Sequence, residues 1–412
     1  MRVNGIIAEY NPFHNGHKYH LEQSRQVTGA DYNIIVLSSN FTQRGEPAIV
    51  DKFIRTRMAL ENGADLVIEL PISHSASSAE FYAQGGISIL DQLGVVDTIC
   101  FGSECGQIDI LLEYAKILSE ESFAFVKDLK SGLSAGHSYP NARNRAISVS
   151  HPEMAKNEYI LASPNNILGI EYLKALLRLE SNIKPYTILR AGSDYHDRYI
   201  TTSFCSALAL RQGILSGQDP ESLAPQMPAS AFETLKSSLE STPAITINDF
   251  SHMLLYKLLM DQDLGYEAYM DVSEDLSAKM KKKLHHFEGY TSFCDLLKSK
   301  DMTYARISRC LLHIMLDMKK EDYLAFGEPA RIPYARVLGF RRDAQPLLTA
   351  IKGNTSIPFI TKLADANTIL NPQAYNLLSQ DLRRGSIYES IASQKAGRPA
   401  RDERRIPLEI VG

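Results

Sequence analysis

The sequence contains no tryptophan and few cysteines for its 412 residues. The five cysteines form no CxxC pair, and their odd number argues against a disulfide framework or a zinc site. No apolar run approaches the ~20 residues of a membrane helix, and the short one before Glu9 lacks the features of a signal peptide. These absences predict a cytoplasmic protein with no membrane association, no disulfide-linked partner and no dedicated metal site.

Charge of neither sign dominates the chain, which carries a net charge of −4. The excess is uneven: residues 1–245 hold 27 acidic and 20 basic side chains, whereas residues 246–412 hold 21 and 24. Apolar residues make up 44%, as in ordinary globular proteins. The mild positive excess of the second half is compatible with an anionic partner without requiring one.

Short apolar runs alternate with helical patterns over the first 200 residues. Runs of this kind predict buried strands at residues 3–9, 32–38, 66–69, 98–101 and 184–190. The intervening patterns predict helices at residues 16–28, 51–62, 79–93, 108–118 and 164–179. Strands separated by helices indicate an α/β fold, with a Rossmann-like, doubly wound parallel sheet covered on both faces.

Composition divides the chain into three parts. We expect residues 1–217 to form the α/β domain, with a helical insertion at about 119–163. Residues 218–246 are rich in Pro, Ser and Ala and predict a linker. Residues 247–412 predict a mainly helical domain with a mixed portion at 336–363, and we expect the Arg-rich last ~20 residues to be poorly ordered in isolation.

Chemistry-bearing residues follow the first predicted strand. His14, Gly16 and His17 lie where that strand gives way to a helix, and ligands of open α/β sheets bind beyond the carboxyl ends of the strands. The helix N-terminus offers free N–H groups and a positive dipole end to an anion. Gly16 would let a nucleotide approach the backbone. Two imidazoles at this point can stabilise charge on an α-phosphate as pyrophosphate leaves.

Six blocks of the sequence resemble one known family. Residues 5–17 (GIIAEYNPFHNGH) are similar to the HxGH motif of the nucleotidyltransferase superfamily. The wider set resembles the tRNA(Met) cytidine acetate ligases, and its other members are QRGEPA at 43–48, GADLVIELP at 63–71, FGSE at 101–104, PNNILGIEY at 164–172 and GRP at 397–399. The motif alone specifies only the superfamily, whereas the set is more specific.

The resemblance implies a two-step reaction. ATP, as its Mg²⁺ complex, and acetate would give acetyl-adenylate, and the acetyl group would pass to N4 of the wobble cytidine of elongator tRNA(Met). His14 and His17 would be catalytic. The implied ATP-binding residues are Ile7, Ala8, Glu9, Tyr10, Asn11, Pro12, Phe13, His14, Asn15, Gly16, His17, Lys18, Tyr19, His20, Gly102, Asn165, Arg190, Ala191 and Arg211.

Several of these residues also have simpler explanations. Gly102 would be an ordinary turn glycine, Asn165 a helix cap, and Arg190 a surface cation. Arg211 belongs to a block, 206–211, that resembles the second superfamily signature, where hydroxyl groups hold phosphates. Leu208 stands where that signature has a threonine, so Ser203 and Ser206 would have to supply the hydroxyl groups.

Candidates for substrate and tRNA contacts lie outside the motif. The loop after the second strand carries Asn40, Gln43 and Arg44, and an arginine there suits a carboxylate, a phosphate or RNA. Basic side chains of the second half are candidates for tRNA phosphates, although such runs are more often solvated helix faces: Lys281, Lys282, Arg341, Arg342, Arg383, Arg384 and Arg398.

Two other functions compete with the acetate ligase. A small-molecule adenylyltransferase of the same superfamily would rarely need so long a second half. An RNA-binding module that has lost its activity would not need His14, Gly16 and His17 to be intact.

Overall fold

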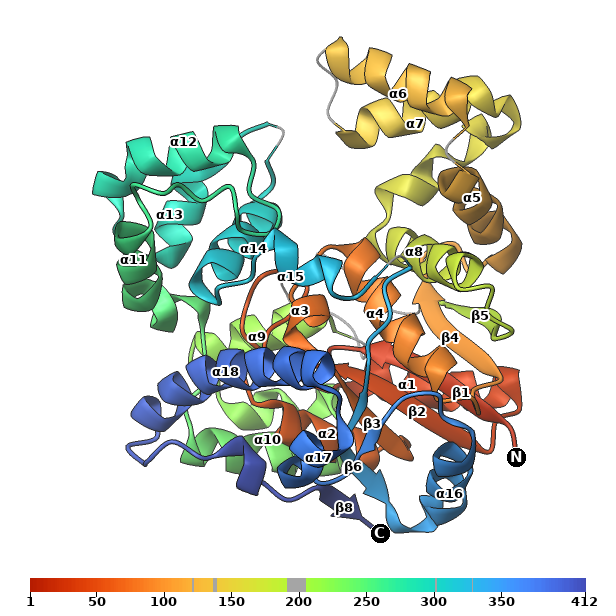
Figure 1. Ribbon diagram of the computed structural model, residues 1–412. Helices are drawn as coiled ribbons and strands as arrows, with labels where there is room; N and C mark the ends of the chain where they lie inside the picture. The colour runs from red at the N-terminus through yellow and green to blue at the C-terminus, as the bar shows by residue number, and fades with distance from the viewer. Residues whose placement is uncertain (121, 136–138, 191–204, 301, 328) are drawn as a thin grey trace.

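The computed structural model describes residues 1–120, 122–135, 139–190, 205–300, 302–327 and 329–412. Its centre is a sheet whose first five strands run parallel in the order β5-β4-β1-β2-β3. These strands are β1 (Val3–Ala8), β2 (Tyr32–Ser38), β3 (Leu66–Leu70), β4 (Thr98–Ser103) and β5 (Lys184–Leu189). The strand order and the intervening helices confirm the Rossmann-like prediction (Figure 1).

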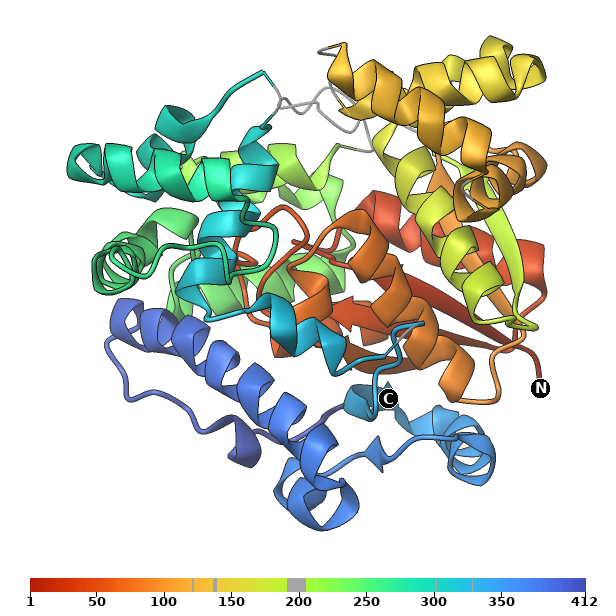
Figure 2. The same ribbon diagram turned by 45° about the horizontal axis from the view of Figure 1, so that its top comes forward.

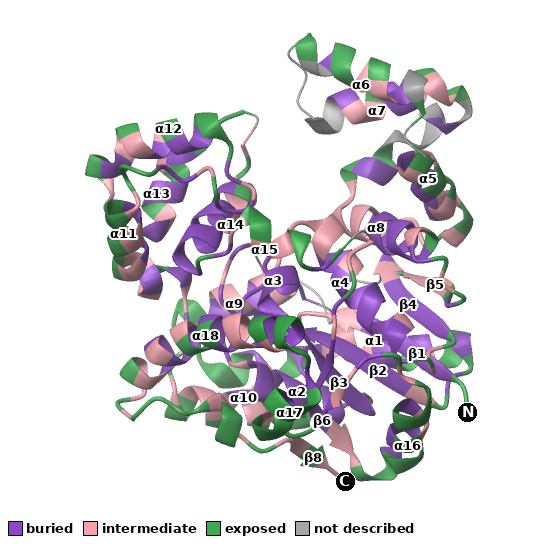
Figure 3. Cartoon of the chain, in the orientation of Figure 1, coloured by how far each residue is buried: buried purple, intermediate pink, exposed green. Residues whose placement is uncertain are grey.

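Both faces of the sheet are covered over its central strands, which explains the unbroken apolar run Ile34–Leu37 of β2. On β2, Ile34 and Val36 pack in one cluster, together with residues of α4, α5 and α8, whereas Ile35 and Leu37 pack in another. The second cluster contains residues of α1, α2, α9 and α10. All four side chains are 0% exposed, and Figure 3 shows the central strands as buried. A strand buried on both faces needs no polar alternation.

The helices predicted in the first half lie close to their expected places, and the structure adds the short α3, for which the sequence predicted no helix. They are α1 (Asn15–Thr28), α2 (Lys52–Leu60), α3 (Ile72–Ser75), α4 (Ala79–Gln92), α5 (Ile108–Glu120), α8 (Pro164–Arg178) and α9 (Ala207–Leu215). Between α5 and α8, the expected helical insertion contains α6 (Phe123–Ser134), α7 (Tyr139–Ser150) and the 3₁₀ helix η1 (Pro152–Ala162). In Figure 1, α6 and α7 stand away from the sheet as a helical pair.

The expected linker at 218–246 is wrong as a description of this segment. It contains α10 (Ala229–Ser241), whose Ala231, Phe232 and Leu235 are buried in the cluster that covers the sheet beside α2. Pro228 stands at the N-cap of α10, so the prolines mark the start of a helix. The 3₁₀ helices η2 (Pro220–Ser222) and η3 (Ala224–Gln226) precede it.

A helical bundle follows, as the sequence predicts. It comprises α11 (Ser251–Met260), α12 (Glu274–Lys283), α13 (Tyr290–Leu297), α14 (Tyr304–Met315) and α15 (Lys320–Leu324), with the 3₁₀ helices η4 (Ile247–Phe250) and η5 (Leu284–His286). Its apolar core also includes Phe41, Ile72 and Tyr388 from outside the bundle. The bundle therefore shares its core with the sheet domain and with α18 (Pro372–Lys395).

The chain then returns to the sheet, which corrects the expectation of a separate domain from residue 247 to the end. Strand β6 (Ala335–Arg341) lies antiparallel beside β3, while β7 (Phe359–Ile360) and β8 (Glu409–Val411) run parallel to β6. The remaining elements are η6 (Arg342–Ala344), α16 (Gln345–Asn354), η7 (Leu363–Asp365), α17 (Ala366–Ile369) and η8 (Glu403–Arg405). Leu347 of α16 and Leu377 of α18 belong to the same apolar cluster as Val337 of β6, and Figure 2 shows these helices along the lower side of the molecule.

The Arg-rich end of the chain is tied to this edge by buried ion pairs. Glu403 accepts from Arg336 on β6 (2.5 Å) and pairs with Lys52 of α2, and Glu69 on β3 pairs with the same two cations. All four groups are largely buried. Within the described residues, no helix has both the length and the hydropathy that crossing a membrane requires.

Candidate active site

The HNGH segment caps helix α1 through its own imidazoles. His14 is the N-cap residue, and its Nδ1 accepts the N–H of Gly16 at 3.0 Å. Nδ1 of His17 accepts the N–H of His14 at 3.3 Å. The two rings stack, with centroids 3.7 Å apart and an angle of 26° between the planes. Because each Nδ1 is an acceptor, each neutral ring carries its proton on Nε2 and can donate it to a ligand.

These histidines are held in their neutral form. Burial, followed by the positive charges of Arg190 and Arg211, lowers the pKa of His14 to about 3. Burial and the neighbouring His14 ring lower the pKa of His17, and burial with Arg190 lowers that of His20 to about 4. The imidazoles therefore act as hydrogen-bond donors near neutral pH, and the two arginines supply the positive charge.

Gly16 makes room for the His14 ring. A Cβ at position 16 would lie 2.8 Å from Cε1 and 3.0 Å from Nδ1 of His14. We predicted that this glycine lets a nucleotide approach the backbone, and Gly16 does line the cavity. The structure adds a second reason for glycine, because any side chain at this position would displace the capping ring.

A cavity of about 250 Å³ opens beside these rings. Its walls come from the carboxyl ends of β1, β4 and β5, the loop after β2, and helices α1, α4, α8 and α9. β1 and β4 are neighbours where the strand order reverses, the place at which doubly wound sheets bind ligands. The cavity is lined by most of the residues that were predicted to bind ATP or substrate: Ile7, Ala8, Glu9, Tyr10, Asn11, His14, Gly16, His17, Tyr19, His20, Gln43, Arg44, Gly102, Asn165, Arg190 and Arg211.

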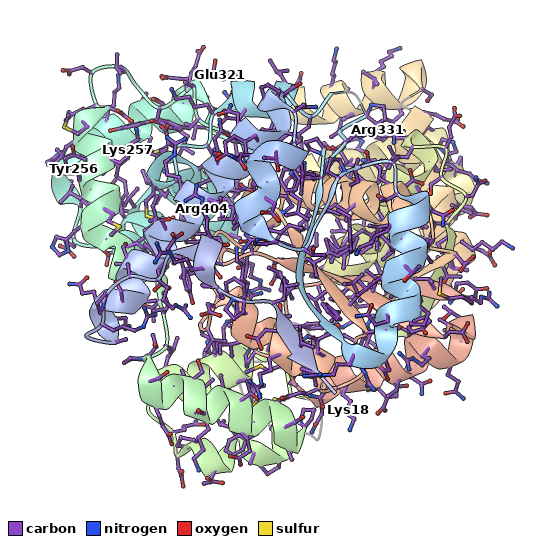
Figure 4. All side chains as sticks on the ribbon, turned by 60° about the horizontal axis from the view of Figure 1, so that its bottom comes forward. Lys18, Tyr256, Lys257, Glu321, Arg331 and Arg404 are labelled. Atoms are coloured by element: carbon purple, nitrogen blue, oxygen red, sulfur yellow. The ribbon has the colours of Figure 1, made fainter. Side chains whose placement is uncertain are left out.

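Four residues predicted to bind ATP do not line this cavity. Phe13 is fully buried against Tyr10 and His17, and Pro12 beside it is buried. Asn15 donates its side-chain amide to the carbonyl of Pro225 (2.8 Å). Lys18 pairs with Glu22 at 3.9 Å and lies at the edge of the molecule (Figure 4). Ala191 and Ser203 lie outside the described residues.

Gly102 and Asn165 each have a structural partner. A Cβ on Gly102 would lie 3.2 Å from Cγ of Arg190, so this glycine makes room for the stem of that arginine. The Asn165 amide donates to Glu104 at 2.6 Å, and the same carboxylate accepts the backbone N–H groups of Asn165 and Asn166 at the start of α8. Both residues still border the cavity, which keeps them as candidates for nucleotide contacts.

Helix α9 brings the second signature to the cavity. Ser206 caps the helix by accepting the N–H of Ala209 at 3.1 Å. Arg211 donates to the carbonyl of Asn11 at 2.8 Å, which ties α9 to the HNGH loop. Leu208 lines the cavity where the family pattern has a threonine, so the described part of this block presents Ser206 and Arg211 as its polar groups.

The family model of the HIGH nucleotidyl transferases matches residues 1–403. The tRNA(Met) cytidine acetate ligase of Caldicellulosiruptor saccharolyticus is 41% identical over 390 residues, which cover 94% of each chain. That of Halothermothrix orenii is 37% identical over 99% of each. The chain belongs to this ligase family of HIGH nucleotidyl transferases.

Solved structures of the family have the same fold. Thermotoga maritima TmcAL in its apo form is 30% identical, with a TM-score of 0.94 over all of both chains. The same protein bound with alpha-thio ATP gives a TM-score of 0.91 at 29% identity. The family resemblance drawn from the sequence motifs is thus confirmed.

The loop after β2 reaches the cavity with only part of its predicted residues. Gln43 and Arg44 line the cavity, and the N–H of Gln43 donates to Glu9 at 2.9 Å. Asn40 is 5% exposed, and its Oδ1 accepts the N–H of Lys52 at 2.9 Å. Asn40 therefore accepts a backbone N–H group at the start of α2 and does not line the cavity. The prediction that it contacts substrate is corrected on this ground.

Sequence reasoning missed Arg55, which sets the relative position of the two cavity loops. Its guanidinium is fully buried and donates to the carbonyls of Glu9 (2.7 Å), Ser38 (2.9 Å), Ser39 (2.5 Å) and Val50 (3.3 Å). The carbonyls of Glu9 and Ser38 lie where β1 and β2 end. Four carbonyl acceptors around one planar group fix both strand ends at once. Tyr82 and Tyr172, from α4 and α8, were also missed as cavity walls.

The basic candidates for tRNA contacts do not form one surface. Lys281 and Lys282 lie on α12, whereas Arg341 ends β6 and Arg342 follows it, on the opposite side of the molecule (Figure 1). Arg342 and Arg383 are exposed, and Arg341 pairs with Asp343 at 2.8 Å.

Two of these arginines pair with carboxylates of the protein itself. Arg384 is 5% exposed and bonds Asp322 (3.1 Å) and the carbonyl of Leu316 (3.3 Å), which corrects its prediction as a tRNA contact. Arg398 pairs with Glu389 at 2.5 Å. Arg383 and Arg384 are neighbours in sequence, but consecutive residues of a helix point about 100° apart, so Arg383 is exposed while Arg384 is buried.

Proposed function

We propose that this protein activates acetate with ATP and transfers the acetyl group to N4 of the wobble cytidine of elongator tRNA(Met). The observation that carries the proposal is the pair of imidazole Nε2 donors at the cavity beside Arg190 and Arg211. Membership of a family whose relatives carry this ligase name, and a related structure bound with an ATP analogue, support it.

In the first step, an acetate oxygen attacks the α-phosphorus of ATP as the bond to the bridging oxygen of pyrophosphate breaks. The Nε2–H groups of His14 and His17 donate to the α-phosphate oxygens, and Arg190 and Arg211 balance the charge that moves to pyrophosphate. Mg²⁺ enters as part of the ATP complex. In the second step, the cytidine amine attacks the acetyl carbon, AMP leaves and the amine loses one proton.

Positioning matters for the second step, because the exocyclic amine of cytosine is a weak nucleophile. An anticodon loop offers its wobble base unpaired, so the base can enter a cavity of this kind. The proposed site of action is the cytoplasm, and half-buried Lys281 and exposed Lys282, Arg342 and Arg383 remain proposed tRNA contacts.

The decisive experiment is ATP–pyrophosphate exchange with the purified protein, followed by mass spectrometry of digested tRNA. Exchange that requires acetate but not RNA, with N4-acetylcytidine formed when tRNA(Met) is added, is the expected result. Exchange only with another acid would make the protein a small-molecule ligase. Retention of tRNA without exchange would make it a non-catalytic binding module.

His17→Ala tests the role of the imidazole donor. We expect it to abolish exchange and to leave tRNA retention on a filter near the wild-type level. His17→Asn is the matched variant, because the amide oxygen of asparagine replaces Nδ1 as the acceptor while the Nε2 donor is lost. Loss of exchange in both variants supports catalysis by Nε2–H, whereas activity retained in His17→Asn would reduce the ring to a capping role.

A further inference from the structure

Residues 42–46, named here the pocket turn, form a compact unit at the cavity. The N–H of Gly45 donates to the carbonyl of Thr42, and the N–H of Thr42 donates to the carbonyl of Glu46, both at 2.9 Å. Thr42, Gln43 and Arg44 line the cavity. The turn thus brings Arg44 to the cavity from a loop that is separate from the HNGH segment.

The pocket turn lies on the other side of β1 from Arg190. Arg190 follows β5, which is reached from β1 through β4, whereas Arg44 follows β2, the neighbour of β1 on its opposite edge. The positive charge of Arg190 lowers the pKa of His14, so Arg190 lies near the imidazoles that are proposed to bind the phosphates. In phosphoryl transfer the attacking and leaving oxygens lie roughly in line on opposite sides of the phosphorus. A cation opposite to the pyrophosphate side is placed to receive the attacking carboxylate.

Helix α14 of the bundle holds the pocket turn by its backbone. Ser308 Oγ donates to the carbonyl of Gly45 at 2.8 Å, and Ser308 is 0% exposed. Gly45 has φ +76°, and a Cβ there would lie 2.4 Å from the backbone N of Arg309. Turn and helix are therefore in direct backbone contact, and only glycine fits between them.

Helix α14 is itself firmly placed. Tyr290 on α13 donates its hydroxyl to the carbonyl of Ser308 at 2.8 Å. The ring nitrogens of His313 contact two backbone carbonyls, those of Met270 (3.0 Å) and Ala76 (2.9 Å), so the ring joins the bundle to the segment between α3 and α4. These contacts hold Ser308 in place on α14. The hydrogen bond from Ser308 to Gly45 therefore also holds the pocket turn in place.

We propose that the pocket turn is the carboxylate subsite of this enzyme, with Arg44 as the cation that binds a small carboxylate, and that Ser308 is its positioning residue. The inference rests on the proposed function, because it assigns one substrate of that reaction to one loop. It makes the helical bundle part of the activation site.

Separate KM values for acetate and for ATP in the exchange assay test the proposal. Arg44→Ala removes the charge-assisted hydrogen bonds, so the KM for acetate rises about thirtyfold, while the KM for ATP stays within about twofold. Ser308→Ala removes one neutral hydrogen bond and raises the KM for acetate about fivefold. A rise confined to the KM for ATP, or no rise in either variant, overturns the proposal.

Gly45→Ala has a matched control in the chain. Gly217 has φ +73°, nearly the same as Gly45, but nothing lies within 4 Å of a Cβ built on it. Gly217→Ala thus carries the same backbone strain without a collision, and we expect its KM for acetate to be unchanged while that of Gly45→Ala rises more than tenfold. Equal changes of the KM for acetate in the two variants would contradict a role for the contact with α14. If Gly45→Ala does not fold, the KM for acetate of Ser308→Ala tests that role instead.

Exchange by the wild-type protein distinguishes failure of the proposed function from failure of the carboxylate subsite. Absence of acetate-dependent exchange in the wild type refutes the proposed function. Wild-type exchange that Arg44→Ala and Ser308→Ala leave unaltered refutes the carboxylate subsite alone. Filter retention of tRNA is expected to be equal in wild type and all variants, and its loss in Ser308→Ala would indicate a purely structural role.

Discussion

His14 combines two roles in one ring, since it caps α1 through Nδ1 and faces the cavity. Its folded pKa of about 3 lies below the ordinary value of 6.5 because of burial and of Arg190 and Arg211. Below pH 6.5 the unfolded chain therefore binds a proton on His14, whereas the folded protein binds it only near pH 3. The contribution of neutral His14 to the free energy of unfolding is fully present above pH 6.5 and is lost as the pH falls from 6.5 towards 3.

His14→Asn is expected to weaken that pH dependence. Asparagine is a good N-cap, so the hydrogen bond to Gly16 can be kept while the titrating group is removed. Between pH 7 and pH 5 the free energy of unfolding of the variant should fall by about 2 kcal/mol less than that of the wild type. Urea unfolding at the two pH values measures the difference, and parallel losses in both proteins would contradict the depressed pKa.

Gly16→Ala should disable the site without unfolding the protein. The added Cβ would stand 2.8 Å from the His14 ring, so the ring must leave its capping position and the Nε2–H donor moves with it. We expect acetate-dependent exchange to fall more than tenfold. Gly353→Ala is the control: Gly353 lies in α16 with nothing within 4 Å, and alanine there should stabilise the helix by about 0.5–1 kcal/mol with full exchange.

At the scale of elements, α2 organises the cavity through Arg55. Arg55→Lys should lower the free energy of unfolding by about 3 kcal/mol, because one ammonium cannot reach four carbonyls that are then left unpaired. Exchange activity should fall as well, since the ends of β1 and β2 lose their common anchor. Arg57→Lys on the same helix, with a side chain 54% exposed, should change stability by less than about 0.5 kcal/mol. Equal stabilities of the two variants would contradict the clamp.

The strands and helices of the first half could be predicted because local signals agree with the tertiary structure. A run such as Ile34–Leu37 is apolar because both faces of β2 are covered, and Asp51 and Ser206 mark helix starts by capping them. HNGH and Arg44 were predicted to be near each other because the carboxyl ends of parallel strands share one edge.

Elements whose place depends on distant partners could not be predicted in this way. Strand β6 pairs with β3 across more than 260 residues, and Arg336 within it looks like a surface residue unless Glu69 and Glu403 are known to face it. Arg55 and Arg384 are buried for the same reason: their acceptors are carbonyls and carboxylates supplied by other segments. Sequence position alone does not distinguish them from solvated arginines.

At the scale of the whole molecule, Lys52, Glu69, Arg336 and Glu403 form an electrically balanced buried group. Burial opposes the charge on Glu403, but Lys52 and Arg336 outweigh it and lower the pKa of Glu403 to about 2. Glu403→Gln leaves an unbalanced buried cation and should lower the free energy of unfolding by about 3 kcal/mol. Asp402→Asn, whose side chain is 49% exposed, should cost less than about 0.5 kcal/mol. Similar melting temperatures for the two variants would show that the group does not stabilise the fold.

The pairing of β6 with β3 also bears on how the protein is made. A ribosome that has finished the HNGH segment and Arg211 has not yet synthesised β6, the antiparallel neighbour of β3, or Glu403, the second carboxylate that pairs with Lys52. A product that ends between residues 212 and 334 therefore carries every cavity residue named here, yet lacks β6, β7 and β8. The sheet of the amino-terminal half is therefore completed only by segments that are synthesised more than 120 residues after the last cavity residue, Arg211.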